Sequence, residues 1–292
     1  MLHIHRIQNG VLEDARSVGI VGVGLIGGSI AIAALRSGYQ VCLYDQAGAA
    51  NLASDGFRNA RIIDDLKDMA AQSRMIILAT PISAIASIIV RLVPFLHSEH
   101  IVSDVASVKG PAVTTIHEAI GNKCDYIPVH PMAGSEKSGV EAARPDLFSG
   151  AVTLLCSEFA RDAVNVRFVM DFWKDLGTRV FATSVEKHDE MVAAMSHLPH
   201  LIAALLVIHV AENDVAALDV CGSGFRDLTR IASGAPELWA DILVSNAAAL
   251  ADHLCGFRDL IERTLPLLAS GDGKKLQALL DVAKQNRDRL TR

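Results

Sequence analysis

The sequence lacks the features by which several protein classes are recognised. Lysine and arginine together number 27 against 33 aspartate and glutamate residues, a net charge of −6, so the basic excess of a nucleic-acid-binding protein is missing. No run of like charge extends beyond a few residues, which argues against a solvated acidic or basic tail. We therefore expect no nucleic-acid partner.

Cysteine is too sparse and too scattered to form a disulfide framework. The number of cysteines is odd and the sequence contains no C-x-x-C pair, so a cysteine zinc site is also unexpected. The spacing favours buried free thiols in a reducing cytosol. The five residues are Cys42, Cys124, Cys156, Cys221 and Cys255.

Long hydrophobic runs and targeting signals are missing as well. The N-terminal MLHIHRIQNG lacks the charged-then-apolar pattern of a signal peptide. The longest apolar run, residues 201–211, is interrupted by His209 and is too short to span a bilayer. We expect a soluble cytoplasmic protein with no membrane partner.

Alternating strand and helix patterns fill the first part of the chain. Strands that alternate with helices predict a parallel sheet with right-handed crossovers. Alanine- and leucine-rich text with helical spacing follows from residue 188 onward, without a clear strand pattern. We therefore expect an α/β Rossmann-type domain over residues 1–183, with a mostly parallel sheet, and an all-α domain over residues 184–292. The expected strands are residues 17–23, 40–45, 75–80, 100–104, 125–129, 151–156 and 178–182.

The expected helical domain is unusually apolar for its size. Residues 193–211 and 247–254 carry few charges, and helices that are apolar nearly all round must be buried against something. A central helix of the domain itself is one explanation. A subunit interface is favoured, because roughly 110 residues of helix can hardly bury that much surface alone.

A glycine-rich turn, GVGLIG at residues 22–27, follows the first expected strand and opens the first expected helix. Gly22 permits the tight turn, Gly24 lets the backbone approach a pyrophosphate, and Gly27 lets helix and strand pack closely. The free N–H groups at the start of this helix, where Leu25 and Ile26 lie, favour phosphate groups. The turn predicts a dinucleotide site.

Asp45 ends the second expected strand, and its carboxylate can accept hydrogen bonds from ribose hydroxyls. The same carboxylate would repel a 2′-phosphate, and no arginine or lysine occurs in the next dozen residues. This favours NAD over NADP as the cofactor. We also place Thr80, at the end of the third expected strand, in the cofactor site. An FAD site or a purely structural glycine turn is the alternative.

Polar residues gather in the segments that follow two further expected strands. These segments are SDVASVK at residues 103–109 and HPMAGSEKSG at residues 130–139. Ligands of open α/β sheets bind at the carboxyl ends of the strands, so we expect these side chains near the cofactor. A third polar group lies in the helical part, at residues 196–200 (SHLPH), 224–230 (GFRDLTR) and 236–239 (PELW).

Taken in order, the motifs resemble the prephenate/arogenate dehydrogenase family of tyrosine biosynthesis. GVGLIGGS, SDVASVK, HPMAGSEKSG, SHLPH, GSGFRDLTRIA and PELWADI span about residues 18–241. The resemblance implies NAD-dependent oxidative decarboxylation of prephenate, arogenate or both. It also implies a helical C-terminal domain that forms a homodimer. No room is evident for a fused chorismate mutase or a regulatory domain, so a monofunctional member is expected.

The resemblance also implies roles for individual residues. His130 matches the family's H-P-x-x-G histidine and is the expected acceptor of the ring hydroxyl proton. Ser107 is expected to orient the same hydroxyl, with an ordinary helix N-cap as the alternative. Arg230 matches the T-R-I arginine, whose guanidinium suits a carboxylate. We expect Arg230 to hold the side-chain carboxylate, because firm pairing to the ring carboxylate would oppose its loss. An ion pair with Asp227 is the alternative.

Several further side chains are expected at or near the substrate. His200 is a substrate contact by the family match, and His197 is either a second contact or a satisfied helix histidine. Glu136 is expected to gate or polarise the site, with a surface ion pair as the alternative. Lys109 is expected to pair with an acid or with backbone, and Trp239 to lie in the core. The two histidines lack a convincing third ligand, so no metal is expected.

Two other functions stay open at this point. A β-hydroxyacid or imino-acid oxidoreductase of the same two-domain build would be favoured by a lysine reaching the substrate from the helical domain. The motifs offer His200 and Arg230 instead. A non-catalytic NAD-binding sensor is the other alternative. The remaining histidines, among them His188, are expected to be structural or surface residues.

Overall fold

The structure, a computed structural model, describes residues 16–48, 55–135 and 137–290. Contacts group the chain into two compact units, one ending at Asn246 and the other beginning at Ala247. The first unit carries both sheets and the helices up to α9, and the second consists of α10 and α11.

The main sheet has six parallel strands in the order β3-β2-β1-β4-β5-β6. The order reverses between β1 and β4, and the crevice outside the carboxyl ends of strands at such a point is where open α/β sheets bind ligands. The strands are β1 (Ser17–Val21), β2 (Gln40–Tyr44), β3 (Arg61–Ile62), β4 (Met75–Leu78), β5 (Ile101–Asp104) and β6 (Asp125–Tyr126).

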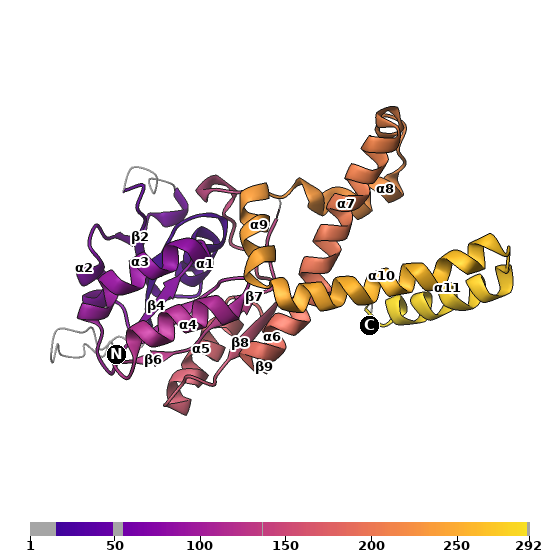
Figure 1. Cartoon of the computed structure of the whole chain (residues 1–292). Helices are drawn as coiled ribbons and strands as arrows, with labels where there is room; N and C mark the ends of the chain where they lie inside the picture. The colour runs from indigo at the N-terminus through magenta and orange to yellow at the C-terminus, as the bar shows by residue number, and fades with distance from the viewer. Residues whose placement is uncertain (1–15, 49–54, 136, 291–292) are drawn as a thin grey trace. The chain divides into compact units, whose positions relative to one another are not determined.

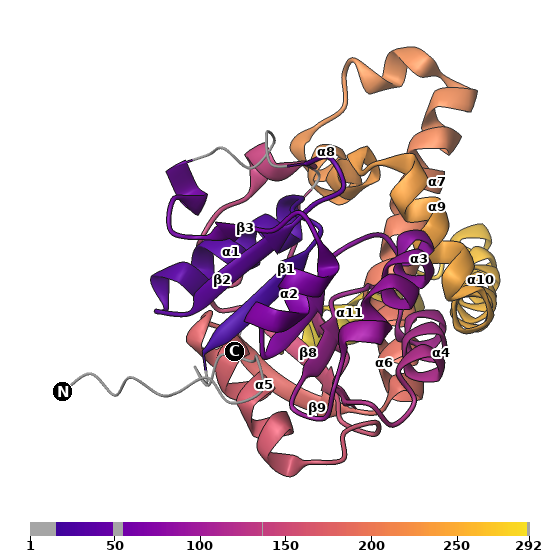
Figure 2. The ribbon, with the colours of Figure 1, turned by 90° about the vertical axis from the view of Figure 1, so that its left-hand side faces the viewer.

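Helices cover both faces of this sheet (Figure 2). Alternate strand residues enter opposite cores: Val18 and Ile20 join one cluster, and Val21 joins the other. Helices α1 (Leu25–Arg36) and α5 (Ala163–Asp175) pack on the first face. The opposite face is covered by α2 (Leu66–Gln72), α3 (Ile82–Leu92) and α4 (Lys109–Ile120).

A second, three-stranded sheet follows the main one. It contains β7 (Val129–Pro131), β8 (Val152–Cys156) and β9 (Arg179–Thr183), with β7 antiparallel and β9 parallel to β8. The strand expected at residues 125–129 is therefore wrong as a single strand, because it divides between β6 and β7. Pro128 lies between them and has no backbone N–H to continue the ladder of the main sheet.

The rest of the first unit is helical. Ser184 caps α6 (Val185–Val192) by accepting from the Lys187 N–H, and a π-turn (Ala193–His197) joins α6 to α7 (Leu198–Asn213). Helices α8 (Ser223–Thr229) and α9 (Pro236–Ser245) follow. No strand occurs among the described residues after Thr183, as expected. The expected domain boundary at residue 184 stays a prediction.

The helix from α6 to α7 is continuous over Val185–Asn213, and by length and composition it could cross a membrane. The expectation concerned the apolar run at residues 201–211, which is one part of this longer helix. The mean hydropathy of its most apolar window is 1.9, and 28% of that window is buried. One such helix is weak evidence for a membrane span, because the core helix of a water-soluble protein passes the same test.

The second unit is an antiparallel helical hairpin of α10 (Ala247–Ala269) and α11 (Gly273–Asp288) (Figure 1). Gly271 takes a φ of +66° in the connecting turn, and Asp272 caps α11 by accepting from the Lys275 N–H. Several large apolar side chains of this hairpin are exposed. They are Leu260, Ile261, Leu265, Leu268, Leu280 and Val282.

The five cysteines are free, as expected, but they differ in exposure. Three of them are buried, as expected: Cys42 lies on β2, Cys124 directly before β6 and Cys156 on β8. Cys221 is half-buried and Cys255 on α10 is exposed, so the expectation of burial is wrong for these two.

Candidate active site

The glycine-rich turn lies between β1 and α1, beside the end of β4. Gly22 has a φ of +93°, and a Cβ there would lie 2.7 Å from the Ala79 carbonyl oxygen. A Cβ on Gly27 would lie 1.9 Å from the Gly22 carbonyl oxygen, so only glycine fits at either position. A Cβ on Gly24 would meet nothing within 4 Å. No side chain of the described residues caps α1, which leaves the N–H groups of its first turn available to a ligand.

Two polar side chains flank this turn. The Asp45 carboxylate accepts from the Val23 N–H through Oδ2 at 2.7 Å and from the Ala47 N–H through Oδ1 at 2.9 Å. These bonds fix the carboxylate next to the turn. The Thr80 Oγ1 is buried and has no hydrogen-bond partner within the described chain, and the Thr80 Cγ2 lies 2.6 Å from a Cβ built on Gly22. An orphaned buried hydroxyl and a crowded glycine cradle fit a bound dinucleotide.

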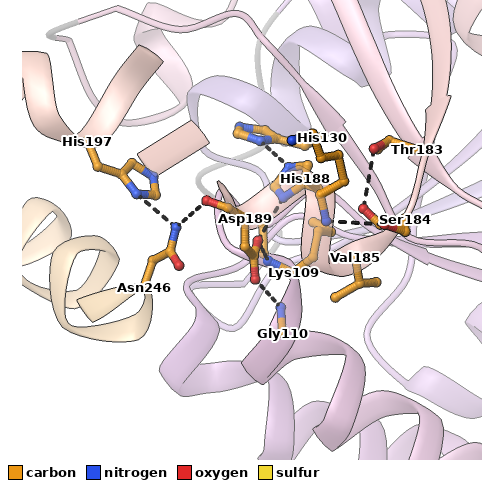
Figure 3. A network of polar contacts seen from close by, with 12 residues as sticks. Lys109, Gly110, His130, Thr183, Ser184, Val185, His188, Asp189, His197 and Asn246 are labelled. Atoms are coloured by element: carbon orange, nitrogen blue, oxygen red, sulfur yellow. Dashed lines mark hydrogen bonds and ion pairs between the residues drawn. The ribbon is translucent and has the colours of Figure 1, made fainter. Parts of the chain in front are cut away.

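A chain of hydrogen bonds leads from His130 in β7 to α6 (Figure 3). His130 Nδ1 lies 2.9 Å from His188 Nε2, and His188 Nδ1 lies 2.7 Å from Asp189 Oδ1. We call these three residues the histidine relay. An ionised carboxylate only accepts, so His188 Nδ1 carries the hydrogen, and the His188 Nε2 accepts from His130 Nδ1–H. Neutral His130 therefore presents the lone pair of Nε2 as its free proton acceptor.

Both histidines of the relay are held in the neutral form. The pKa of His130 lies well below 6.5, first because burial disfavours the imidazolium, and then because His188, Lys109 and His197 are neighbours whose protonated forms would repel a charge on His130. Burial also lowers the pKa of His188, although its hydrogen bond to Asp189 acts in the opposite direction. His130 is thus a neutral base near pH 7.

Asp189 is anchored by the first turn of α4. Its Oδ1 accepts from the Lys109 N–H and its Oδ2 from the Gly110 N–H, each at 2.8 Å. Burial alone would raise the pKa of Asp189, but the hydrogen bonds from His188 and from these two N–H groups lower it below its usual range. The carboxylate therefore stays ionised, and the positive end of the helix macrodipole favours that charge.

Lys109 pairs with an acid and with backbone, as expected. Its Nζ forms an ion pair with Asp104 and donates to the Val129 carbonyl oxygen at 2.7 Å, and both charged side chains are fully buried. Asp104 also accepts from the Tyr126 hydroxyl at 2.7 Å and from the Ala106 N–H at 2.9 Å. The buried ion pair thus connects β5, α4, β6 and the start of β7.

His197 at the end of the π-turn is joined to the same network through Asn246 (Figure 3). The Asn246 Nδ2 donates to the Asp189 carbonyl oxygen at 2.8 Å and lies 3.3 Å from His197 Nδ1. His197 Nδ1 therefore accepts, and its hydrogen sits on Nε2, which is buried without a partner among the described residues. Burial is the main cause that lowers the pKa of His197 to about 4.

His200 stacks on Trp239, with ring centroids 3.4 Å apart and planes 13° from parallel. Gly234 makes room for this pair, since a Cβ there would lie 2.5 Å from Trp239 Nε1. The His200 Nδ1 is buried and finds no hydrogen-bond partner in the described part of the chain. The expectation that Trp239 lies in the core is wrong, because the residue is only half-buried.

The structure also describes two further expected site residues, Ser107 and Arg230. Ser107 is half-buried two residues before α4, whose N-cap is Val108, so the alternative role of Ser107 as that cap is wrong. Arg230 is exposed and begins the short 3-10 turn after α8. Glu136 lies outside the described residues.

Sequence reasoning missed three members of the network: His188, Asp189 and Asn246. His188 was expected to be structural or at the surface, whereas it is fully buried and bonded to His130. The one signal in the sequence is an adjacent His-Asp pair just inside a helix that begins with a serine cap.

Comparison with known proteins identifies the family. Residues 30–182 match the nucleotide-binding domain of prephenate dehydrogenase, and residues 184–282 match its dimerization domain. The cyclohexadienyl dehydrogenase of Zymomonas mobilis is 31% identical over 274 residues, which cover 89% of this chain and 91% of that protein. The chain belongs to the prephenate dehydrogenase family. The prephenate dehydrogenase of Bacillus subtilis is 32% identical over 284 residues, covering 93% of this chain and 75% of that one.

Solved structures of the family share the fold. The prephenate dehydrogenase of A. aeolicus, crystallised with hydroxyphenyl propionate and NAD+, superposes with a TM-score of 0.84 at 29% identity, covering 94% of this chain and 97% of that one. The Synechocystis arogenate dehydrogenase gives a TM-score of 0.81 at 28% identity, covering 93% and 99%.

Membership in the prephenate dehydrogenase family confirms the expected fold class and the expected enzyme class. The protein is a dehydrogenase that uses a nicotinamide cofactor and a small-molecule substrate. The relatives described above are named prephenate, cyclohexadienyl and arogenate dehydrogenases, which supports this enzyme class over a sensor or another oxidoreductase. The glycine turn at residues 22–27 precedes the residues matched to the nucleotide-binding domain, so its assignment depends on the geometry given above.

Proposed function

We propose that this protein catalyses the NAD-dependent oxidative decarboxylation of prephenate, of arogenate, or of both, in the biosynthesis of tyrosine. The observation that carries the proposal is the histidine relay, which leaves the Nε2 of neutral His130 in β7 as a proton acceptor. The names of the relatives, among them prephenate, cyclohexadienyl and arogenate dehydrogenases, support the substrate class.

The chemistry requires one proton acceptor. The carbinol C–H bond of the ring breaks, and a bound nicotinamide supplies the acceptor for the hydride. The hydroxyl proton passes to His130 Nε2, the bond to the ring carboxylate breaks, and its electron pair makes the ring aromatic as carbon dioxide leaves. A proton then returns to the phenolate oxygen. A base that is neutral at rest and charged only after the transfer suits this sequence.

The relay stabilises the charge that forms on His130. When Nε2 takes the proton, the new imidazolium donates from Nδ1 to His188, and the ionised Asp189 lies at the far end of the same hydrogen bonds. These groups are already fixed by α4 and α6, so little reorganisation is needed as the charge appears.

Polar groups from several elements would hold the substrate. We assign Ser107 to the ring hydroxyl and Arg230 to the side-chain carboxylate. The partnerless Nε2–H of His197 and Nδ1 of His200 are buried polar atoms that a ligand could satisfy. Glu136 is retained as a gating or polarising group on the family match alone.

The cofactor site is assigned to the glycine turn and its flanks. The proposed residues are Gly22, Gly24, Leu25, Ile26, Gly27, Asp45 and Thr80. The carboxylate of Asp45 is fixed beside the turn by two backbone N–H groups, and its negative charge supports NAD over NADP.

A homodimer through the helical part completes the proposal. The match of residues 184–282 to a dimerization domain supports it, as do the exposed apolar side chains of α10 and α11. The two domain matches, which end at residue 182 and begin at residue 184, support the boundary between residues 183 and 184. A cytoplasmic location is part of the same proposal.

The test is a comparison of initial rates with purified protein. Formation of the reduced nicotinamide is measured with prephenate and with arogenate, each with NAD and with NADP. Turnover of either substrate with a higher kcat/KM for NAD supports the proposal, and the ratio between substrates names the preferred one. NAD binding without turnover of either substrate would overturn it.

A further inference from the structure

We propose that Lys109 is a positioning residue for the proton acceptor: its buried ammonium holds the strand that carries His130 and keeps a fixed positive charge beside the His130–His188 pair. The inference depends on the proposed role of His130. It adds a residue that touches neither substrate nor cofactor and acts through the histidine relay.

Lys109 holds the relay at both of its ends. The side chain donates from Nζ to the carbonyl oxygen of Val129, the residue directly before His130 in β7, at 2.7 Å. The backbone N–H of the same residue donates to Asp189 Oδ1 at 2.8 Å. One residue at the start of α4 therefore fixes the distance between the strand of the base and the carboxylate that ends the relay.

The ion pair of Lys109 and Asp104 is poorly explained as a contribution to stability. Both side chains are fully buried, and removing two charges from water costs as much free energy as the pair returns in many proteins. A well-packed apolar pair of similar volume would stabilise the fold equally well or better. A charge at this place therefore calls for a role beyond packing.

The charged and titratable groups around the two imidazoles come from five elements. They are Lys109 on α4, Asp104 on β5, Asp189 on α6 and His197 on the π-helical turn, and Cys156 on β8 lies near the first three of these. The positive charge of Lys109 lowers the pKa of both His130 and His188, whereas Asp189 and Asp104 raise that of His188. Burial raises the pKa of Cys156 to about 12, so its thiol carries no charge near neutral pH.

Lys109 thus keeps His130 unprotonated and ready to accept the substrate proton at a lower pH than burial alone would allow. It also makes the imidazolium a better donor when the proton returns to the phenolate oxygen. A lysine whose charge does not act on His130 would leave the titration of His130 unchanged.

The experiment compares Lys109→Met and the double variant Asp104→Asn/Lys109→Met with the wild type. The double variant removes both partners, so no unpaired buried carboxylate destabilises it. Lys123→Met, at an exposed lysine beyond the end of α4, is the matched control. The titration of His130 is followed by nitrogen NMR of histidine-labelled protein, with the signal assigned through His130→Gln. The pH dependence of kcat/KM is measured alongside.

In folded Lys109→Met, His130 should titrate at a higher pH than in the wild type. The shift should be smaller in the double variant, because the negative charge of Asp104 is removed together with the positive charge of Lys109. On the acid limb of the profile, kcat/KM should fall about tenfold, the effect of one pH unit, with KM nearly unchanged. Lys123→Met should match the wild type. Folded Lys109→Met with an unshifted His130 titration and acid limb would overturn the proposal, and so would a failure of both Lys109 variants to fold. The NMR titration needs no turnover, so an inactive wild type would count against the proposed function and not against this charge effect.

Discussion

His188 bonds to His130 through one ring nitrogen and to Asp189 through the other, and two substitutions should break these bonds separately. The amide of glutamine reaches about as far as the Nε2 of histidine, and the amide of asparagine about as far as Nδ1. His188→Gln should therefore keep an acceptor for His130 Nδ1–H and lose the bond to Asp189. His188→Asn should keep a donor for Asp189 and leave His130 without its partner.

The structure sets the expected sizes of the two effects. Without an acceptor, His130 can move its hydrogen to Nε2 and lose both its orientation and its role as a base. We expect His188→Asn to lower kcat about 10²- to 10³-fold, within the range for loss of a positioned general base. His188→Gln should lower kcat about tenfold, because the tautomer of His130 is kept and only the stabilisation by Asp189 is weakened. In His188→Asn, the Nδ1 of His130 is buried without its hydrogen-bond partner, which should lower the free energy of unfolding by about 1–3 kcal/mol.

The assay is reduced-nicotinamide formation at saturating substrate and cofactor, with urea unfolding measured on the same proteins. His117→Asn, at an exposed histidine of α4, is the control for an ordinary histidine replacement. Equal losses in His188→Gln and His188→Asn would refute the tautomer argument. An almost unchanged kcat in a folded His188→Asn would refute the relay itself.

Three further substitutions or conditions test other parts of the account. Arg230→Ala should raise KM about tenfold or more with a small change in kcat, because a carboxylate contact made equally in the ground and transition states affects binding alone. Initial-rate kinetics measure both constants, with Lys123→Met as the control. Gly27→Ala should weaken NAD binding at least about tenfold, because the alanine Cβ would lie 1.9 Å from the Gly22 carbonyl oxygen. Fluorescence titration measures the affinity, and wild-type affinity in this variant would contradict the assignment of the turn. His100 is fully buried, and burial lowers its pKa from 6.5. Its contribution to stability should therefore be complete above about pH 6.5 and be lost as the pH falls, so the urea midpoint should decrease between about pH 7.5 and pH 5.5, less steeply in His100→Asn.

Much of the fold follows from local features of the sequence. Strands such as β1 and β4 are short apolar runs that end at glycine or just before proline, and they lie within the expected ranges. The exception at residues 125–129 has a tertiary cause. The Ile127 N–H still bonds to β5, through the Val102 carbonyl oxygen, whereas the Pro128 carbonyl oxygen accepts from Cys156 in the second sheet. The only local sign of this change of sheet partner is Pro128, which has no backbone N–H to donate to the ladder.

From the sequence, candidate site residues could be named only where they stand in a recognisable motif. His130, Ser107 and the glycine turn stand in recognisable segments, whereas His188 and Asp189 stand in none. His188 lies 58 residues beyond His130, and its burial depends on how α6 packs against α4 and β8. Nothing in the spacing distinguishes it from a surface histidine. The buried state of Lys109 is likewise a product of the fold, because the sequence showed only a lysine after a strand.

The most direct test of the central claim is the effect of His130→Asn on kcat. Wild type and variant are compared in reduced-nicotinamide formation at saturating NAD and substrate, with NAD affinity measured for both. The account predicts turnover by the wild type and a loss of about 10²- to 10⁴-fold in the variant, with NAD affinity retained. A folded variant that binds NAD and retains kcat close to that of the wild type would contradict the assignment of His130 as the proton acceptor.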